Sequence, residues 1–237
     1  MLFFTSDLKD YHVHAADGEM GKVKDLYFDD NNWAIRYAVI DTRKWLPGRR
    51  VLLSPTSIIT VNENEGHLEV KHDKDTIRNS PSIPEDQPMT QDMEDTLAGY
   101  YGWSRYWMGN LLWGPNVTPA TDLDSNTENP QIFEEKLDEQ KRYDLRSEDE
   151  TNGFKVHADD GKIGTLTDMI FNSDNWKLQY MVVRDSEAIT EEAYYVFDLN
   201  NIESVDWFEN DIYINTTLEK IKAGNVYETK QSIMASL

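Results

Sequence analysis

The sequence DGEMGKVKDLYF over residues 17–28, followed after a short turn by WAIRYAVI over residues 33–40, has the pattern of a β-hairpin. The second strand alternates large apolar residues with small or charged ones, which predicts one buried face and one part-exposed face. The first strand breaks this period between Val23 and Leu26, and a β-bulge near Lys24 and Asp25 would explain the break. The turn is rich in Asp and Asn, which tolerate the left-handed backbone that hairpin loops need.

The chain contains this hairpin twice. When the sequence is aligned with itself so that Val13 meets Val156, 12 of the 31 positions from Tyr11 to Asp41 meet identical residues. One insertion extends the match, so that residues 51–53 meet residues 195–197. This self-similarity predicts an internal duplication. The residues expected to form the repeated core are Gly21, Asp25, Phe28, Trp33 and Tyr37 in the first copy and Gly164, Asp168, Phe171, Trp176 and Tyr180 in the second.

Five or six short strands in each copy can hide their edges by curling into a small barrel. The predicted fold is therefore mainly β, with two small SH3-like barrels joined by a partly helical, aromatic-rich connector. We expect the first barrel over residues 1–80, the connector over residues 81–142, the second barrel over residues 143–222 and a tail over residues 223–237.

The connector has three parts. Its proline-rich start leads to Thr90, a helix N-cap that predicts a short helix over about residues 91–100. Aromatic residues follow at a density that suits either a protein interface or a linker packed on the barrels, and they include Trp103, Tyr106, Trp107 and Trp113. Residues 115–130 look disordered, and the acidic stretch up to residue 142 is expected to be flexible.

Composition excludes several classes of function. The formal net charge is −21 at pH 7, which argues against binding to nucleic acids or to anionic membranes. The absence of cysteine excludes disulfides, thiolate nucleophiles and cysteine metal sites, and it fits a reducing cytoplasm. No apolar run approaches the roughly 20 residues that span a bilayer. We therefore expect a soluble cytoplasmic protein without membrane insertion.

Chemical motifs are few. No nucleophile-elbow, Walker or dinucleotide motif appears, so we expect no enzyme, no catalytic residues and no cofactor. His12 and His14 lie two apart on a strand and could form a metal pair, but a third ligand is missing, and we interpret them as structural. Asp25 and Asp168 could be paired acids, although acceptance of backbone amides at the bulge is the favoured role.

A basic loop stands out in this acidic chain. Arginines and lysines cluster around Pro47 and Gly48, and they could dock an acidic partner or pair with the protein's own acidic second half. The second copy carries the acidic segment 187–192 instead. The candidate protein-interaction residues are Arg43, Lys44, Trp45, Arg49 and Arg50 of this loop, with Trp103, Tyr106, Trp107 and Trp113 of the connector.

The turn glycines, Asp25, Phe28, the WAIRYAV strand and the WLPGR loop resemble the PRC-barrel family. The likeness is to its tandem, soluble bacterial members, relatives of the cytoplasmic domain of the photosynthetic reaction centre H subunit. It covers about two-thirds of the chain. In the H subunit this domain packs on a membrane complex and influences electron and proton transfer without catalysing a reaction. A related barrel in a ribosome maturation factor binds a ribosomal protein.

The resemblance implies a non-catalytic scaffold, regulatory or protein-interaction role, with a protein partner or self-association. A photosynthetic complex as the partner follows only by family analogy. A second hypothesis is a small-molecule or metal sensor that uses a cleft between the two barrels. A third is an RNA-processing or ribosome-associated factor, which the acidic charge disfavours.

Overall fold

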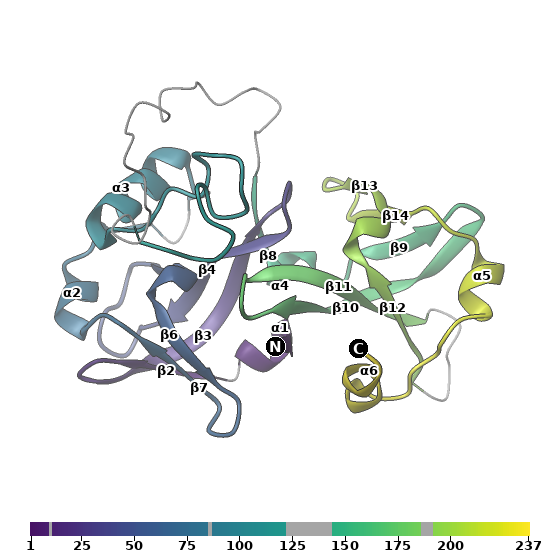
Figure 1. The fold of residues 1–237 in the computed structure, drawn as a ribbon, viewed down its shortest axis with the longest axis horizontal. Helices are drawn as coiled ribbons and strands as arrows, with labels where there is room; N and C mark the ends of the chain where they lie inside the picture. The colour runs from purple at the N-terminus through teal and green to yellow at the C-terminus, as the bar shows by residue number, and fades with distance from the viewer. Residues whose placement is uncertain (10, 85–86, 122–143, 186–191) are drawn as a thin grey trace. The chain divides into compact units, whose positions relative to one another are not determined.

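The structure is a computed structural model, shown as a ribbon in Figure 1, and it describes residues 1–9, 11–84, 87–121, 144–185 and 192–237. The acidic segment after residue 121 and residues 187–191, both subjects of predictions above, lie outside the described residues. The fold is mainly β, as the sequence predicts, with two strand-rich units. The repeat 1 unit comprises residues 7–147 and 173–177, and the repeat 2 unit comprises residues 1–6, 148–172 and 178–237.

In the repeat 1 unit the strands are ordered β5-β4-β3-β2-β7-β6, with an added strand, β8, on β3. The pair β2 and β7 is parallel, and the other pairs are antiparallel. The strands are β2 (His12–Ala15), β3 (Gly18–Asp29), β4 (Ala34–Asp41), β5 (Val51–Leu53), β6 (Ile58–Asn62), β7 (His67–Val70) and β8 (Leu145–Ser147). The helices are η1 (Pro55–Ser57), α2 (Lys74–Arg78) and α3 (Gln91–Tyr101), where Thr90 and the helical spacing predict a helix.

The repeat 2 unit has the same strand order, β12-β11-β10-β9-β14-β13, with β1 added on β10. Its strands are β1 (Leu2–Phe4), β9 (Lys155–Ala158), β10 (Gly161–Asn172), β11 (Lys177–Asp185), β12 (Tyr194–Asp198), β13 (Ile202–Asp206) and β14 (Asp211–Ile214). Its helices are α4 (Glu148–Thr151), η4 (Leu199–Asn201), α5 (Leu218–Lys222) and α6 (Lys230–Ser236), while α1 (Thr5–Lys9) follows β1 and crosses between the units. The pairings among the described residues run in an open order in both units, and barrel closure stays a prediction.

The duplication extends beyond the strands. α2 and α5 fall at equivalent positions once the single insertion is allowed for, so that Lys74 meets Leu218. Isolated bridges join Arg50 to Ile83 and Tyr194 to Tyr227, which are equivalent pairs in the same alignment. Each repeat therefore continues for several residues past its helix, to a segment that returns to the edge of the sheet beside β5 or β12.

Each unit is completed by the first strand of the other repeat. β1 pairs with β10, where Leu2 faces Asn172. β8 pairs with β3, where Leu145 faces Asp29. In the alignment of the two copies, Leu2 corresponds to Leu145 and Asn172 corresponds to Asp29. The repeats therefore exchange their first strands reciprocally and in identical register.

Side chains make the two exchanged strands different from one another. On β8, Arg146 donates to Asp30 (Nε to Oδ2, 2.8 Å) and Ser147 donates to Asp25 (Oγ to Oδ2, 2.6 Å). On β1, the buried Phe4 belongs to an apolar cluster with Ile170, Val182 and Ile233. A Phe at the position of Ser147 would remove a donor from Asp25, and a Ser at the position of Phe4 would leave a hole in an apolar cluster.

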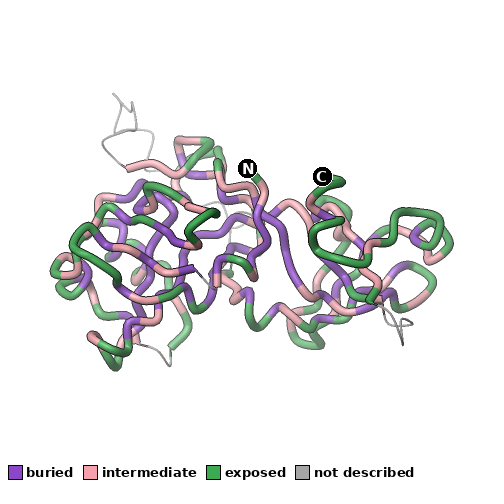
Figure 2. The backbone as a smooth tube through the Cα atoms, turned by 90° about the horizontal axis from the view of Figure 1, so that it is seen from below, coloured by how far each residue is buried: buried purple, intermediate pink, exposed green. Residues whose placement is uncertain are grey.

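The expected part-exposed face of β4 is wrong. Seven of its eight residues are buried, including Arg36, which is 1% exposed. The reason is the connector, which covers the strand: the Arg36 guanidinium lies 4.0 Å from the Tyr106 ring centroid, and the rings of Tyr37 and Trp103 are 6.1 Å apart. Figure 2 shows the backbone coloured by burial, with buried residues in purple.

The hairpin turns also differ from the prediction. The left-handed residue in each is a tryptophan, Trp33 with φ 56° and Trp176 with φ 57°, and not one of the Asp or Asn residues. In the first turn the Trp33 amide donates to the Asp29 carbonyl (3.0 Å), and the Asp29 carboxylate accepts the Asn32 amide (2.5 Å). Stacking of Trp33 on Phe28, with ring centroids 5.4 Å apart, supports this conformation.

The bulge at Asp25 is confirmed. The register of β3 against β4 shifts between Val23 and Asp25, and the Asp25 carboxylate accepts the Leu26 amide (2.7 Å). Asp168 accepts the Met169 amide in the same way (2.9 Å). Both aspartates therefore satisfy backbone amides, as the sequence predicts.

Gly21 and Gly164 are required by a close approach of neighbouring backbone. A Cβ atom on Gly21 would lie 2.1 Å from the Asp41 carbonyl oxygen, and one on Gly164 would lie 1.9 Å from the Arg184 carbonyl oxygen. Only glycine permits this approach in either repeat.

Part of the predicted disorder is wrong. Within residues 115–121, the Ala120 carbonyl accepts the Ser104 amide (3.1 Å), the Asn116 carbonyl accepts the Trp113 amide (2.8 Å) and Thr121 bridges to Trp103. These hydrogen bonds return the chain to the aromatic segment. Residues 122–130 lie outside the described residues.

The strand exchange can be tested by engineered disulfides, because the chain has no cysteine. Facing residues of an antiparallel pair lie within the Cα separation that a disulfide spans. We expect a Leu2→Cys/Asn172→Cys variant to form an intrachain disulfide under mild oxidation, measured by intact mass and non-reducing electrophoresis.

The matched variant is Leu145→Cys/Asn172→Cys, which places both cysteines in the second repeat. It should stay reduced, because β1 occupies the position on β10 that Leu145 would need. Efficient intrachain oxidation of this second pair, with none of the first, would show that the strands are not exchanged.

Candidate functional site

A cleft of about 350 Å³ lies in the repeat 1 unit, beside the basic loop. We call it the basic-loop cleft. The hairpin of β2 and β3 forms one wall, and the end of β4 with the loop that follows forms the other. Its lining residues are His12, Glu19, Met20, Gly21, Lys22, Asp41, Lys44 and Trp45. The Trp45 indole nitrogen donates to the Met20 carbonyl (2.6 Å), which fixes the aromatic side of the cleft.

The acidic groups of the cleft are already engaged. The Arg43 guanidinium hydrogen-bonds Asp41 (Nη2 to Oδ2, 2.6 Å) and lowers the pKa of that carboxyl to about 2. His12 hydrogen-bonds Glu19 (Nδ1 to Oε1, 2.8 Å), and this contact lowers the pKa of the Glu19 carboxyl. Both carboxylates therefore stay ionised near neutral pH with a basic partner beside them.

The two lysines of the cleft are different. Lys22 and Lys44 are exposed, and among the described residues neither ammonium group forms an ion pair or a hydrogen bond. The cleft thus offers two exposed ammonium groups beside Trp45, and that of Lys44 also acts electrostatically on Glu19. Such a surface suits a carboxylate-bearing ligand that also carries an apolar group.

The second repeat does not reproduce this chemistry. Its equivalents of His12, Glu19, Lys22 and Asp41 are Lys155, Lys162, Thr165 and Arg184, and the positions of Lys44 and Trp45 hold Glu187 and Ala188. The basic-loop cleft is therefore a feature of the first repeat and not a by-product of the fold.

Arg49 and Arg50, by contrast, bind the start of the connector. Arg49 donates to the Ser80 hydroxyl (2.7 Å) and to the Arg78 and Pro81 carbonyls. Arg50 is 8% exposed and donates to the Tyr27 hydroxyl (2.9 Å) and to the Pro84 carbonyl (2.5 Å). These two arginines hold the connector against repeat 1, whereas Arg43, Lys44 and Trp45 belong to or border the cleft.

The predicted aromatic residues of the connector face inward. Trp103, Tyr106 and Trp113 are buried, and Trp107 is half-buried with its ring edge-on to Tyr106 at 5.0 Å. These contacts favour a linker packed on the strands over an exposed interface. Glu94 of α3 is also buried and accepts the hydroxyls of Tyr37 (2.9 Å) and Tyr106.

A buried ion pair anchors this packing. Arg36 donates to Asp29 (Nε to Oδ2, 2.7 Å), and both side chains are fully buried. The Arg36 guanidinium also donates to the Leu112 carbonyl (2.8 Å) and lies 4.6 Å from the Trp113 ring centroid. The equivalent pair in the second repeat is Asn172 and Gln179, which carries no charge.

The remaining predicted residues lie apart from the cleft. Phe28, Tyr37, Phe171 and Trp176 are buried, and Trp33 and Tyr180 are half-buried. His12 borders the cleft, while His14 stacks on His67 with ring centroids 4.7 Å apart. Sequence reasoning missed His12, Glu19, Lys22 and Asp41 as members of one site. A position-by-position comparison of charge between the repeats would have found them.

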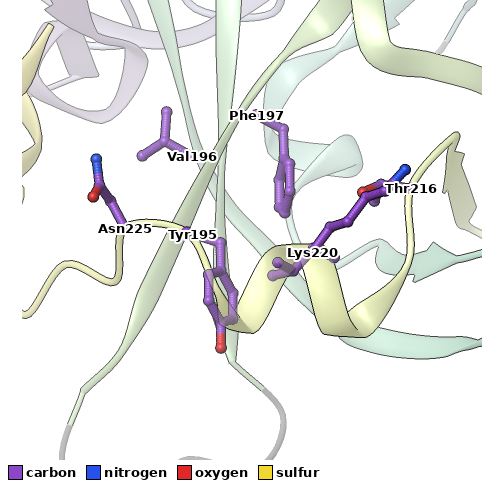
Figure 3. Close-up of a pocket in the computed structure, with 8 residues that line it drawn as sticks. Tyr195, Val196, Phe197, Thr216, Lys220 and Asn225 are labelled. Atoms are coloured by element: carbon purple, nitrogen blue, oxygen red, sulfur yellow. The ribbon is translucent and has the colours of Figure 1, made fainter.

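A second hollow, of about 170 Å³, lies in the repeat 2 unit (Figure 3). Strand β12 contributes Tyr195, Val196 and Phe197, and the Lys220 side chain of α5 extends alongside Thr216. It is smaller than the basic-loop cleft and offers one cation. The basic-loop cleft is therefore the better candidate site.

Comparison with known protein families identifies a domain over the first repeat. A family model described as the PRC-barrel domain matches residues 1–77. Residues 1–77 are a PRC-barrel domain. The match covers β1 to α2, so the cleft lies within the PRC-barrel domain, and it does not extend to the second repeat. No curated protein matches the chain. Among the described residues, no helix combines the length and the apolar character that a bilayer crossing requires.

The buried ion pair yields a stability prediction. Asp29→Asn leaves Arg36 as a buried cation without its counter-charge, and we expect a loss of about 3–5 kcal/mol in the free energy of unfolding. The double variant Asp29→Asn/Arg36→Gln copies the second repeat and leaves no buried charge. It should lose clearly less stability than Asp29→Asn in urea titrations. An equal or larger loss would mean that the charge itself is not what the connector packing depends on.

A hydrogen-bond relay joins the connector to η1. The buried Ser57 hydroxyl accepts the Trp103 indole N–H (2.7 Å) and lies 2.7 Å from His72 Nε2, to which it donates when that imidazole is neutral. Burial, with a smaller contribution from Lys71, lowers the pKa of His72. A protonated His72 could no longer accept the Ser57 hydroxyl proton, so the neutral form fits the relay.

The relay predicts a pH dependence. The unfolded chain takes up a proton on His72 as the pH falls below the ordinary pKa of about 6.5, whereas the folded chain resists it. The contribution of His72 to stability is therefore complete above this pKa and declines as the pH falls from it toward the lower folded pKa. We expect the native chain to lose more stability than His72→Gln between pH 7.5 and pH 5.5 in chemical denaturation. Parallel losses in the two proteins would contradict the relay.

Proposed function

We propose that this chain is a non-catalytic interaction or scaffold protein of the cytoplasm, in which both repeats are PRC barrels and a partner segment docks in the basic-loop cleft. One observation carries the proposal. Lys22 and Lys44 present exposed positive charge beside Trp45 in a protein whose net charge is −21. Two lysines and a tryptophan therefore line one cleft, and the second repeat does not reproduce this set.

The cleft favours a particular partner chemistry. Two ammonium groups select carboxylates, and the Trp45 wall selects an apolar or aromatic group between them. An acidic peptide segment with one aromatic residue has both. The acidic surroundings disfavour nucleic acid, whose phosphates would meet repulsion from the rest of the chain.

The charges of the cleft support binding over catalysis. Asp41, with its pKa of about 2, is too weakly basic to accept a proton efficiently near neutral pH. Glu19 is likewise a weaker base than usual because of its contact with His12. The eight described residues that line the cleft include no hydroxyl or thiol nucleophile.

Selection from a random peptide library displayed on phage tests this function with the full chain as bait. We expect enriched peptides to combine Asp or Glu with an aromatic residue. Synthetic versions should bind Lys22→Glu/Lys44→Glu at least about tenfold more weakly, because each former attraction becomes a repulsion. Lys71→Glu is the control, since Lys71 is an exposed lysine of the same unit outside the cleft. Peptides that bind the double variant as well as the native chain would refute the cleft as the docking site.

A further inference from the structure

The turn between β13 and β14 presents an isolated aromatic side chain. Phe208 is 90% exposed, which is the highest value among the large hydrophobic residues described. Its neighbour Trp207 packs edge-on against the buried Phe154, with ring centroids 5.7 Å apart. We call residues 206–209 the Phe208 tip.

The Phe208 tip is held by its own hydrogen bonds. The Asp206 carboxylate oxygen Oδ1 accepts the backbone amides of Phe208 and Glu209, both at 3.0 Å. Asn210 completes the turn with φ 60°. A turn fixed in this way holds the backbone that carries Phe208, so little backbone entropy is lost on binding.

The aromatic residue of the tip is specific to the second repeat, whereas the acidic residues of the turn are not. Asp206 and Glu209 are exposed on either side of Phe208. The equivalent turn of the first repeat, residues 63–66, reads ENEG and contains no aromatic residue. The tip and the basic-loop cleft are thus opposite features, one in each repeat, that the duplication does not share.

We propose that the Phe208 tip docks in the basic-loop cleft of a second copy of this chain. The proposal rests on the cleft argued under the proposed function and names its occupant. An aromatic ring flanked by two carboxylates is the chemistry that Lys22, Lys44 and Trp45 select. The cleft volume of about 350 Å³ admits one aromatic ring. Phe208 is 90% exposed, so its ring is available for such a contact.

The contact is heterologous, because a patch of one chain meets a different patch of the next. Such contacts add chains head to tail, into rings or open assemblies. The net charge of −21 opposes association at low ionic strength. At about 0.15 M salt the screening length is roughly 8 Å, so contacts between the tip and the cleft survive while the long-range repulsion weakens.

Analytical ultracentrifugation of the full chain at about 0.15 M salt tests the proposal. We expect the mean mass of the native chain to rise with concentration. Phe208→Ala and Lys22→Glu/Lys44→Glu should each associate at least about tenfold more weakly, and Lys71→Glu should behave as the native chain. Phe208 is almost fully exposed, so its truncation removes little packing within the unit.

Mixing the two variants distinguishes this contact from a symmetric one. Phe208→Ala keeps an intact cleft, and Lys22→Glu/Lys44→Glu keeps an intact tip. Their mixture should form one contact per pair and stop at a 1:1 dimer, whereas each variant alone stays monomeric. Self-association of Phe208→Ala equal to that of the native chain would overturn the proposal, as would a mixture that stays monomeric.

The outcome is separable from that of the proposed function. Lysine-dependent binding of selected peptides, together with a native chain that remains monomeric up to millimolar concentration, would overturn the self-docking and keep the cleft as a binding site. Peptide binding that ignores Lys22 and Lys44 would overturn the cleft itself.

Discussion

The pairing of β1 with β10, and of β8 with β3, is the constraint on which the rest of the chain depends. Because each unit borrows its added strand from the other repeat, neither repeat has a complete set of strands alone. The repeat 2 unit then secures the borrowed strand: Lys230 of α6 binds Asp168 (Nζ to Oδ2, 2.6 Å), and Ile233 packs on Phe4. The two termini of the chain are thereby held in one cluster, and loss of α6 would expose the strand on which the exchange depends.

The two repeats solve the same packing problem with different chemistry. In the repeat 2 unit a short amphipathic helix, α6, covers the apolar cluster. In the repeat 1 unit the connector covers β4, and the contact includes the buried pair of Arg36 and Asp29. A buried ion pair stabilises less than an apolar contact of equal size, but each buried charge must keep its partner, so few other packing arrangements are possible. Arg36 bonds Leu112 and lies against Tyr106 and Trp113, so it fixes where the connector lies.

Local patterns in the sequence predict the hairpins, the bulge at Asp25, the duplication and the capped helix after Thr90, because each depends on residues close in the chain. The strand exchange could not be predicted in this way. The apolar pattern of residues 2–4 would let this strand pair with either repeat. The sequence pattern places Arg36 on a part-exposed face. The connector that covers this residue in the structure is distant from it in the sequence. The sequence named Lys44 and Trp45 but not the rest of the basic-loop cleft, because Lys22 comes to line the same cleft only through the pairing of β3 with β4.

Reciprocal exchange also explains how the repeats could diverge without losing their common fold. Once β1 is apolar and β8 is polar, each fits only one of the two positions, so the repeats can no longer be interchanged. Residues outside the shared core can then differ between the repeats without disturbing the strands. The residues that line the cleft in repeat 1, and those of the Phe208 tip in repeat 2, are mostly positions at which the copies differ. The docking proposed above therefore uses positions where the copies differ, while the positions they share maintain the strands.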